Sequence, residues 1–287
     1  MSLVLDGKAV SADLIEKLKK NVIRLKSEKV FPALAIVRVG DAGASVSYEH
    51  GAVKRCEEVG IDVRRFCLPK DVSQSRLISL IRDINEDGSI HGCLIFLPLP
   101  KHIDEKAVCA ALAPEKDVDG ITPVSQGRVY SSEGVGFPPC TAAACIAILD
   151  HYGISAEGKR CVIVGRSLVI GRPVAMMLLA RNGTVTICHT KTSDLPGIAR
   201  NADILIAATG KTGAVSRDCL TTSQVLIDVG IHVGDNGHLR GDVAPEDLDV
   251  PYAVTPVPGG VGAVTTTILA MHVVKAAEQS VRQGTTR

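Results

Sequence analysis

The chain has 287 residues, of which 46% are hydrophobic and only 3% aromatic, and its formal net charge at pH 7 is +1. A charge this close to zero argues against nucleic acid or a membrane surface as the main partner. No apolar run is long enough to span a membrane, and the first ten residues lack the pattern of a signal peptide. We therefore expect a cytoplasmic protein with a core of Val, Ile, Leu and Ala, and the length favours about two domains.

The cysteines favour free thiols over disulfides or a metal site. There are nine of them, an odd number, and no two are spaced as C-x-x-C. Most lie inside apolar runs, among them Cys93, Cys145, Cys161 and Cys188. Such positions predict buried free thiols in a reducing compartment, and no metal is expected.

The first 139 residues predict alternating helices and strands. Helices are expected at 11–28, 45–59, 73–85 and 104–113, with Ser45 as a candidate N-cap. Strands are expected at 33–39, 61–68 and 91–96, and the last ends where Pro98 and Pro100 forbid further pairing. Alternation of this kind is typical of a parallel sheet with helices packed on it.

A Gly- and Pro-rich stretch at 125–139 is expected to be irregular and to mark a domain boundary. Beyond it, helices are expected at 141–151, 174–180 and 265–281, strands at 161–164, 183–188, 202–207, 224–229 and 252–254, and a hairpin turn at 235–237. The fold class is therefore α/β with two domains. Residues 1–139 would form a parallel-sheet domain completed by residues 265–287, and residues 140–264 a Rossmann-like dinucleotide-binding domain.

The strand that ends at Val164 runs into a turn typical of a phosphate site. Gly165, Arg166 and Ser167 begin the turn, and Gly171 comes just before a helix whose first turn suits Pro173. Backbone N–H groups and the positive end of the helix dipole attract a phosphate at such a turn. The spacing differs from the G-x-G-x-x-G fingerprint, so the motif alone leaves an ordinary strand–helix connection as an alternative.

The next strand, 183–188, is also predicted to be buried, and it ends in His189-Thr190-Lys191-Thr192. A NAD site usually carries Asp or Glu here to bind the ribose 2′-hydroxyl, but no acid occurs before Asp194. Hydroxyls, a lysine and the nearby Arg166 suit a 2′-phosphate instead, so the expected cofactor is NADP. Two charge-assisted contacts of about 1.5–3 kcal/mol each would favour NADP by about a hundredfold or more.

Several short motifs follow one another along nearly the whole chain. They are Val39-Gly40-Asp41 with Ala44, Ser45 and Tyr48, Leu97-Pro98-Leu99-Pro100, Lys116-Asp117-Val118-Asp119-Gly120, Pro139-Cys140-Thr141, Gly165-Arg166-Ser167 with Gly171-Arg172-Pro173, Asp228-Val229-Gly230-Ile231, and Thr255-Pro256-Val257-Pro258-Gly259-Gly260-Val261-Gly262. In this order they resemble the methylenetetrahydrofolate dehydrogenase/methenyltetrahydrofolate cyclohydrolase family. The resemblance implies a homodimer whose two domains face each other across a cleft. It also implies an enzyme of one-carbon metabolism that passes a hydride from methylenetetrahydrofolate to NADP, then opens the methenyl product with water.

The resemblance further implies roles for individual residues. Tyr48 and Asp119 would act in catalysis, Tyr48 lining the folate pocket and Asp119 holding the pterin ring. The other pocket residues would be Leu97, Pro98, Leu99, Pro258, Gly259 and Gly260, and the cofactor would contact Gly165, Arg166, Ser167, Gly171, Thr190 and Ile231. Without the family context, Tyr48 would be interpreted as a half-buried helix residue and Asp119 as a turn residue before Gly120.

Two positions depart from the family pattern. Ala52 stands four residues after Tyr48, where the family has its catalytic lysine, and Phe96 stands where the family has a glutamine bonded to that lysine. Replacing both partners avoids leaving one of them buried and unpaired. Lys54 lies at a different helical spacing from Tyr48 and is interpreted as a surface lysine. Lys101, which follows the prolines, is a lysine from another segment that could reach into the gap left by the missing catalytic lysine.

The cyclohydrolase step needs a group that moves a proton and activates water, and neither Ala52 nor Phe96 can do so. We therefore expect this activity to be lost or weak, with the dehydrogenase retained because the cofactor carries the hydride chemistry. One alternative is a non-catalytic paralogue that binds a nucleotide or a folate-like ligand as a regulator. Another is an enzyme whose reshaped pocket takes a different substrate.

Overall fold

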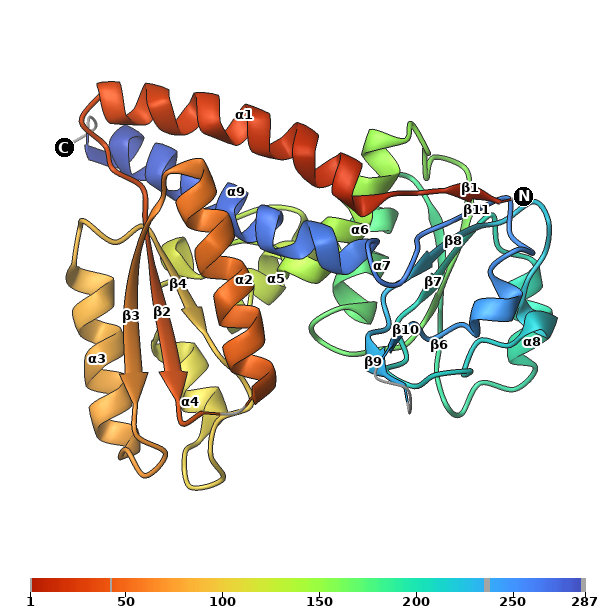
Figure 1. The fold of residues 1–287 in the computed structure, drawn as a ribbon. Coiled ribbons are helices and arrows are strands. Elements are labelled where there is room, and N and C mark those ends of the chain that lie inside the picture. Colours follow the sequence, from red (N-terminus) through yellow and green to blue (C-terminus); the bar gives the residue numbers. More distant parts are fainter. Residues whose placement is uncertain (1, 42, 235–237, 285–287) are drawn as a thin grey trace. The chain divides into compact units, whose positions relative to one another are not determined.

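The computed structural model describes residues 2–41, 43–234 and 238–284, and the chain divides into two compact units (Figure 1). Asp13–Cys140 and Thr266–Arg287 form one of them, which we name the three-stranded unit after its sheet. Met1–Ala12 and Thr141–Thr265 form the other, the six-stranded unit. Both sheets are parallel and helices follow the strands, so the expected two-domain α/β class is confirmed.

The division differs from the expected one at the start of the chain. Residues 1–139 are predicted to share a domain, yet Met1–Ala12 groups with the six-stranded unit. The reason is β1 (Leu3–Val4), which pairs in parallel with β11 (Ala253–Val254). A strand of two residues is too short to produce a periodic pattern, so the sequence does not reveal it.

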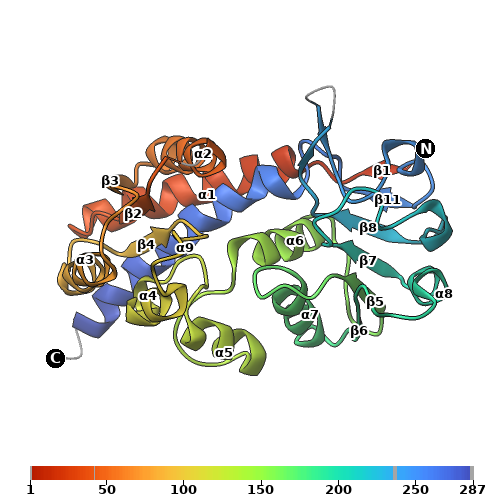
Figure 2. The same cartoon turned by 90° about the horizontal axis from the view of Figure 1, so that it is seen from below.

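The three-stranded unit is built on a parallel sheet in the order β3-β2-β4. Its strands are β2 (Ala33–Val39), β3 (Asp62–Leu68) and β4 (Gly92–Ile95), and its helices α2 (Gly43–Val59), α3 (Gln74–Glu86) and α4 (Glu105–Ala111) each follow one of them. The first five residues of the central strand, β2, are buried, as expected for a parallel strand covered on both faces. Most of α1 (Gly7–Ser27), from Asp13 on, and most of α9 (Val261–Gly284), from Thr266 on, belong to this unit and run side by side in it (Figures 1 and 2).

Capping residues set the starts of two of these helices. The Ser73 hydroxyl accepts a hydrogen bond from Arg76 N at 3.3 Å, and the Asp104 carboxylate accepts one from Lys106 N at 3.0 Å. Both satisfy N–H groups that have no partner inside the helix. The N-cap predicted at Ser45 is wrong, because α2 begins at Gly43 and Ser45 lies inside it.

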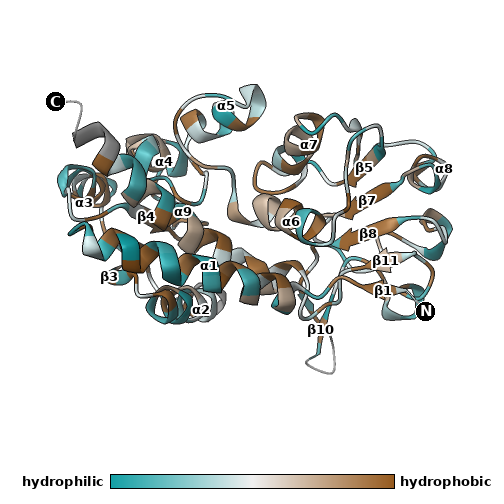
Figure 3. Cartoon of the chain, turned by 90° about the horizontal axis from the view of Figure 1, so that it is seen from above, coloured by the Kyte–Doolittle hydropathy of each residue, from teal (hydrophilic) through white to brown (hydrophobic). Residues whose placement is uncertain are grey.

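The six-stranded unit has strands in the order β1-β11-β8-β7-β5-β6 (Figure 2). The four longest are β5 (Arg160–Val164), β6 (Thr184–Cys188), β7 (Ile204–Ala207) and β8 (Val225–Asp228). The inner strands β5, β7 and β8 are mostly hydrophobic (Figure 3), and every residue in them except Arg160 is buried. β6 lies at the sheet edge with Thr184 and Thr186 exposed, so its prediction as a buried strand is wrong.

Other expectations differ at single elements. Part of the stretch predicted to be irregular, 125–139, is helical, because α5 spans Pro123–Ser131. Thr122 caps this helix by accepting a hydrogen bond from Ser125 N at 3.1 Å, and Pro123 occupies its first turn. The hairpin turn predicted at 235–237 lies outside the described residues, but β9 (His232–Val233) and β10 (Leu239–Arg240) on either side of it pair antiparallel.

The cysteines are as predicted. All nine carry free thiols, and eight of them are buried, including Cys93, Cys145, Cys161 and Cys188. Among the residues that the structure describes, no helix is long and apolar enough to cross a membrane.

Candidate functional site

The turn after β5 lies close to the loop after β7. Gly165 has φ +135°, and a Cβ at this position would collide with the carbonyl oxygen of Ala208, in the loop after β7. Only glycine tolerates both the positive φ and this contact. The predicted glycine at 165 is therefore required by the backbone, and the turn and the β7 loop share one edge of the sheet.

Gly165→Ala is expected to lower the melting temperature by about 4–8 °C, because the strain and the collision cost about 2 kcal/mol. Nucleotide binding should fall with it, since the turn must shift. Gly127→Ala is the matched control, because Gly127 lies in α5 and a Cβ there meets no atom within 4 Å. Thermal melts of both variants check this, and an unchanged melting temperature for Gly165→Ala would contradict it.

The same turn leads into α7 (Gly171–Leu179), and the Ser167 side chain binds the backbone where this helix begins. The Ser167 hydroxyl accepts hydrogen bonds from Ile170 N at 3.1 Å and Gly171 N at 3.4 Å. Arg172 Nε donates to Arg166 O at 3.1 Å, which fixes the backbone between them. The side chains of Arg166 and Ser167 are exposed. An exposed guanidinium and hydroxyl at a helix N-terminus can bind a phosphate group.

The neighbouring strand β6 ends at the same edge, because Val164 of β5 is in register with Cys188. After it, His189 N donates to Thr192 Oγ1 at 2.8 Å, and Lys191 N donates to His189 Nδ1 at 3.1 Å. Thr190 is exposed within this turn. The first acid, Asp194, caps α8 (Leu195–Arg200) by accepting from Gly197 N at 3.0 Å. It is therefore occupied as a cap, and the turn keeps the hydroxyl and lysine composition that fits a 2′-phosphate.

The remaining residues predicted for this unit lie near the start of α9. Ile231, in the loop after β8, is 59% exposed, and its Cδ1 would lie 3.1 Å from a Cβ added at Gly262. Pro258, Gly259 and Gly260 form the turn before α9. These four predicted residues therefore belong to the six-stranded unit, together with the phosphate turn.

In the three-stranded unit, Tyr48 is half-buried on α2, one helical turn before Ala52 and two before Cys56. The Tyr48 ring meets the Phe96 ring edge to face, with centroids 6.0 Å apart and planes at 79°. Burial raises the pKa of Tyr48 well above its ordinary value, and the Asp119 carboxylate raises it further. Ala52 has no exposed surface. Phe96 beside the ring and Ala52 one helical turn on therefore give the tyrosine apolar neighbours on their side.

The two aspartates of the Lys116-Asp117-Val118-Asp119 motif have different surroundings. Asp117 is fully buried and accepts hydrogen bonds from Ile121 N at 3.0 Å and Thr122 N at 2.8 Å, so it holds the turn. Asp119 is half-buried, and desolvation raises its pKa to about 6, although a hydrogen bond from the Cys140 thiol opposes the shift. Sequence reasoning missed Cys140 as a neighbour of Asp119, and its place in a motif was the only signal.

The loop after β4 holds the other predicted residues of this unit. Leu97 and Leu99 are half-buried and pack against the core, and Leu99 N donates to Glu105 Oε2 at 3.1 Å. Pro98 between them is exposed. Lys101 is exposed, and Lys54 lines a separate hollow of about 390 Å³ together with polar residues that include Arg38, Glu49 and His50. This placement agrees with the interpretation of Lys54 as a surface residue.

Comparison with known proteins gives a consistent result. Sequence models of the tetrahydrofolate dehydrogenase/cyclohydrolase catalytic domain and NAD(P)-binding domain match residues 5–119 and 139–281. The bifunctional protein FolD of Clostridioides difficile (strain 630) is 45% identical over 274 residues, which cover 95% of this chain and 96% of that protein.

Two solved structures are similar along their whole length. The bifunctional FolD methylenetetrahydrofolate dehydrogenase/cyclohydrolase of Campylobacter jejuni has a TM-score of 0.94 and 39% identity, covering 97% of this chain and 99% of that one. The methylenetetrahydrofolate dehydrogenase-cyclohydrolase of Trypanosoma brucei, solved with an NADP cofactor and an inhibitor, has a TM-score of 0.91 and 32% identity, covering 98% and 99%.

Proposed function

Because the chain belongs to the tetrahydrofolate dehydrogenase/cyclohydrolase family, we propose that it oxidises methylenetetrahydrofolate to methenyltetrahydrofolate with NADP, in one-carbon metabolism. We further propose that its cyclohydrolase activity is lost or greatly weakened, and we expect the enzyme to be a homodimer. The turn after β5 in the six-stranded unit, from Gly165 to Gly171, supports the first proposal. The apolar pair Ala52 and Phe96 beside Tyr48 carries the second.

The cofactor proposal rests on residues at one edge of the six-stranded unit. The N-terminus of α7 and the Ser167 hydroxyl suit a phosphate, and Arg166 and Thr190 suit the 2′-phosphate that distinguishes NADP from NAD. Ile231 offers an exposed apolar side chain to the nucleotide. Bound NADP would supply the hydride acceptor, so these residues have only to bind and orient it.

Arg166→Gln is expected to raise the Kd for NADP by about 10- to 100-fold and to leave the Kd for NAD within about threefold, because one charged contact to the 2′-phosphate is lost. Isothermal titration calorimetry with each nucleotide measures this. Arg160→Gln is the matched control, since Arg160 is also exposed, at the start of the preceding strand β5, but pairs with Asp203 at 3.1 Å. Equal weakening of NADP and NAD would contradict a role in reading the 2′-phosphate.

On the substrate side, we propose that Asp119 accepts hydrogen bonds from N–H groups of the pterin ring. Asp117 is committed to the backbone of its own turn, which leaves the Asp119 carboxylate as the acceptor of this motif that a ligand can use. Tyr48 would line the pocket with its ring held in place by Phe96. Leu97, Pro98, Leu99 and the turn from Pro258 to Gly260 would shape the rest.

Hydrolysis of the methenyl product needs a group that activates water and moves a proton. The methyl group of Ala52 and the ring of Phe96 can do neither, and Ala52 has no exposed surface at all. Lys54 lines a hollow formed by other residues, and Lys101 is exposed in a loop, so neither is an evident substitute. Hydride transfer makes no comparable demand on these side chains, because it depends on alignment of the two reactants.

Two absorbance assays test the proposal. Methylenetetrahydrofolate and NADP should give a clear rate at the reduced-nicotinamide band, while methenyltetrahydrofolate should disappear little or no faster with the enzyme than without it. Enzyme-dependent hydrolysis that Asp119→Ala abolishes, in protein with an unchanged melting temperature, would contradict the loss of cyclohydrolase activity.

A second candidate is a paralogue that binds a nucleotide or folate-like ligand without this catalysis, or acts on a different substrate. The same observation favours it, because Ala52 and Phe96 change the shape of the surroundings of Tyr48 as well as their polarity. The absorbance assay separates the candidates. Measurable NADP binding without a rate on methylenetetrahydrofolate would support the second.

A further inference from the structure

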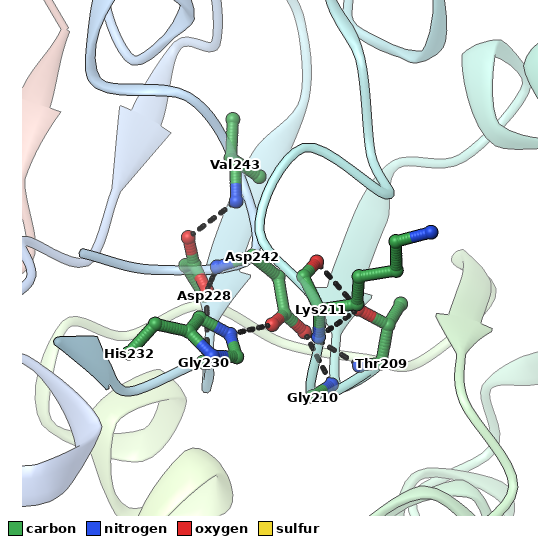
Figure 4. A network of polar contacts seen from close by, with 8 residues as sticks. All are labelled: Thr209, Gly210, Lys211, Asp228, Gly230, His232, Asp242 and Val243. Carbon is green, nitrogen blue, oxygen red and sulfur yellow. Dashed lines mark hydrogen bonds and ion pairs between the residues drawn. The ribbon is translucent and has the colours of Figure 1, made fainter. Parts of the chain in front are cut away.

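Two buried carboxylates join the loops at the carboxyl ends of β7 and β8 (Figure 4). The first, Asp228, is the last residue of β8 and is 1% exposed. Its oxygens accept hydrogen bonds from Gly230 N at 2.9 Å, Asp242 N at 2.9 Å and Val243 N at 3.0 Å. It therefore ties the loop after β8 to the segment that follows the β9–β10 pair.

The second carboxylate, Asp242, has no exposed surface and reaches two further segments. It accepts hydrogen bonds from Thr209 N at 2.5 Å and Gly210 N at 3.3 Å, in the loop after β7. Its other oxygen lies 2.8 Å from His232 Nε2, at the start of β9 (Figure 4). One side chain thus fixes the β7 loop and the β9 strand at once, and two carboxylates in series hold all of these segments together.

This arrangement fixes the position of the Ile231 backbone. Gly230 is held by Asp228 and His232 is held by Asp242, so Ile231 lies between two anchored residues. Its side chain is nevertheless 59% exposed. In open parallel sheets the nucleotide binds outside the carboxyl ends of the strands, and β7 and β8 are paired neighbours there, with Ala207 in register with Asp228.

We propose that His232 and Asp242 are positioning residues for the nucleotide, which hold Ile231 and the Thr209–Gly210 backbone at the nucleotide edge without touching the ligand. The inference rests on the proposed NADP function and adds these two residues to it. Its physical basis is preorganisation: a loop that is already ordered loses less conformational freedom when the ligand binds. Releasing His232 from Asp242 should therefore weaken nucleotide binding more than it slows hydride transfer.

Three variants test this by calorimetric titration of NADP and by steady-state kinetics. His232→Ala removes the donor to Asp242 and should raise both the Kd and the KM for NADP about tenfold, with kcat at saturating NADP within about twofold. His232→Gln keeps an N–H donor that can reach Asp242 and should bind NADP within about threefold of the unaltered protein. Asp249→Asn is the control, because Asp249 is an exposed acid of the same unit, paired with Arg217 at 3.5 Å.

Each result is decisive. A Kd for His232→Ala within twofold of the unaltered protein would overturn the inference, as would failure of His232→Gln to restore binding while its melting temperature is unchanged. If His232→Ala did not fold, His232→Asn, whose amide is too short to reach Asp242, carries the same expectation. An unaltered protein that binds no NADP would contradict the proposed function and this inference together, whereas normal binding by the unaltered protein and by His232→Ala contradicts only the inference.

Discussion

Replacing Ala52 by lysine and Phe96 by glutamine together is expected to raise the cyclohydrolase rate at least about a hundredfold, because a positioned acid–base group contributes about 10²–10⁴-fold to such steps. The new lysine would lie one helical turn after Tyr48 on α2. Decay of methenyltetrahydrofolate absorbance measures the gain. The dehydrogenase rate serves as the internal reference for an intact site.

The two substitutions are expected to depend on each other. Ala52 is completely buried, so a lysine there without a partner would be a buried unpaired cation, which is strongly destabilising. Phe96→Gln supplies an amide oxygen as acceptor, but alone it leaves a polar group beside the Tyr48 ring. We therefore expect Ala52→Lys to lower the melting temperature more than the double variant does. A double-mutant cycle in melting temperature and rate measures this coupling.

Lys54→Ala is the matched control for the lysine position, because Lys54 lies on the same helix but is exposed. It should leave both the dehydrogenase rate and the melting temperature unchanged. A double variant that is folded and active as a dehydrogenase, yet gains no cyclohydrolase activity, would show that more than these two groups was lost. That outcome would shift support to a pocket reshaped for a different substrate.

Asp119→Asn is expected to weaken folate binding by about 10- to 100-fold at pH 8, because the ionised carboxylate that accepts the pterin N–H groups is lost. The same variant should be more stable than the unaltered protein at pH 8. Titration with tetrahydrofolate under anaerobic conditions measures the first effect, and thermal melts measure the second. If Asp119→Asn weakens folate binding and also raises the melting temperature, Asp119 serves substrate binding at the expense of stability.

The sign of the stability effect follows from the pKa. Desolvation raises the pKa of Asp119 to about 6 from an ordinary 3.8, so the folded protein binds the proton more tightly than the unfolded chain. The unaltered protein therefore loses stability as the pH rises through about 4 to 6, and the full loss is present above that range. The shift corresponds to at most about 3 kcal/mol, and we expect about 1–2 kcal/mol because the side chain is partly exposed.

In melts, this predicts that Asp119→Asn gains about 2–6 °C over the unaltered protein at pH 8 and nearly nothing at pH 4. Folate binding by the unaltered protein should also weaken as the pH falls below about 6, where Asp119 takes up its proton. Asp117→Asn is the contrast two residues away, and it should lower the melting temperature because it weakens an acceptor of two backbone N–H groups. A gain for Asp119→Asn that is equal at both pH values would contradict the desolvation argument.

The main elements of both units follow from local patterns in the sequence. The run Ala33–Val39 is apolar enough to predict a strand covered on both faces, and it is the central strand of its sheet. The burial of β6 is predicted wrongly, because this strand lies at the sheet edge and most of its side chains are therefore exposed or half-buried. The sequence pattern does not predict α5, because its cap at Thr122 and its Pro123 lie before a stretch whose glycines and prolines suggest a loop.

Part of the candidate site can likewise be predicted from local sequence, and part of it cannot. The phosphate turn and the absence of an acid before Asp194 are visible in the sequence, because neighbours along the chain create them. The resemblance to a known family then pointed to Tyr48, Asp119 and the altered positions Ala52 and Phe96. Their roles in substrate binding remain proposals, and the structure adds the surroundings: the ring contact of Tyr48 with Phe96 and the raised pKa of Asp119.

The α/β class, most of the helices and strands, and the turn from Gly165 to Gly171 could all be predicted from the sequence, since they depend on the periodicity and identity of residues close together in the chain. The folded structure was needed to learn that Leu3–Val4 joins the sheet beside Ala253–Val254, and that Asp242 fixes both His232 and the β7 loop. These contacts join segments far apart in sequence, and a buried carboxylate is recognised as an anchor only when its donors are known. For this reason the composition of the nucleotide edge could be anticipated, while the residues that hold it in place could not.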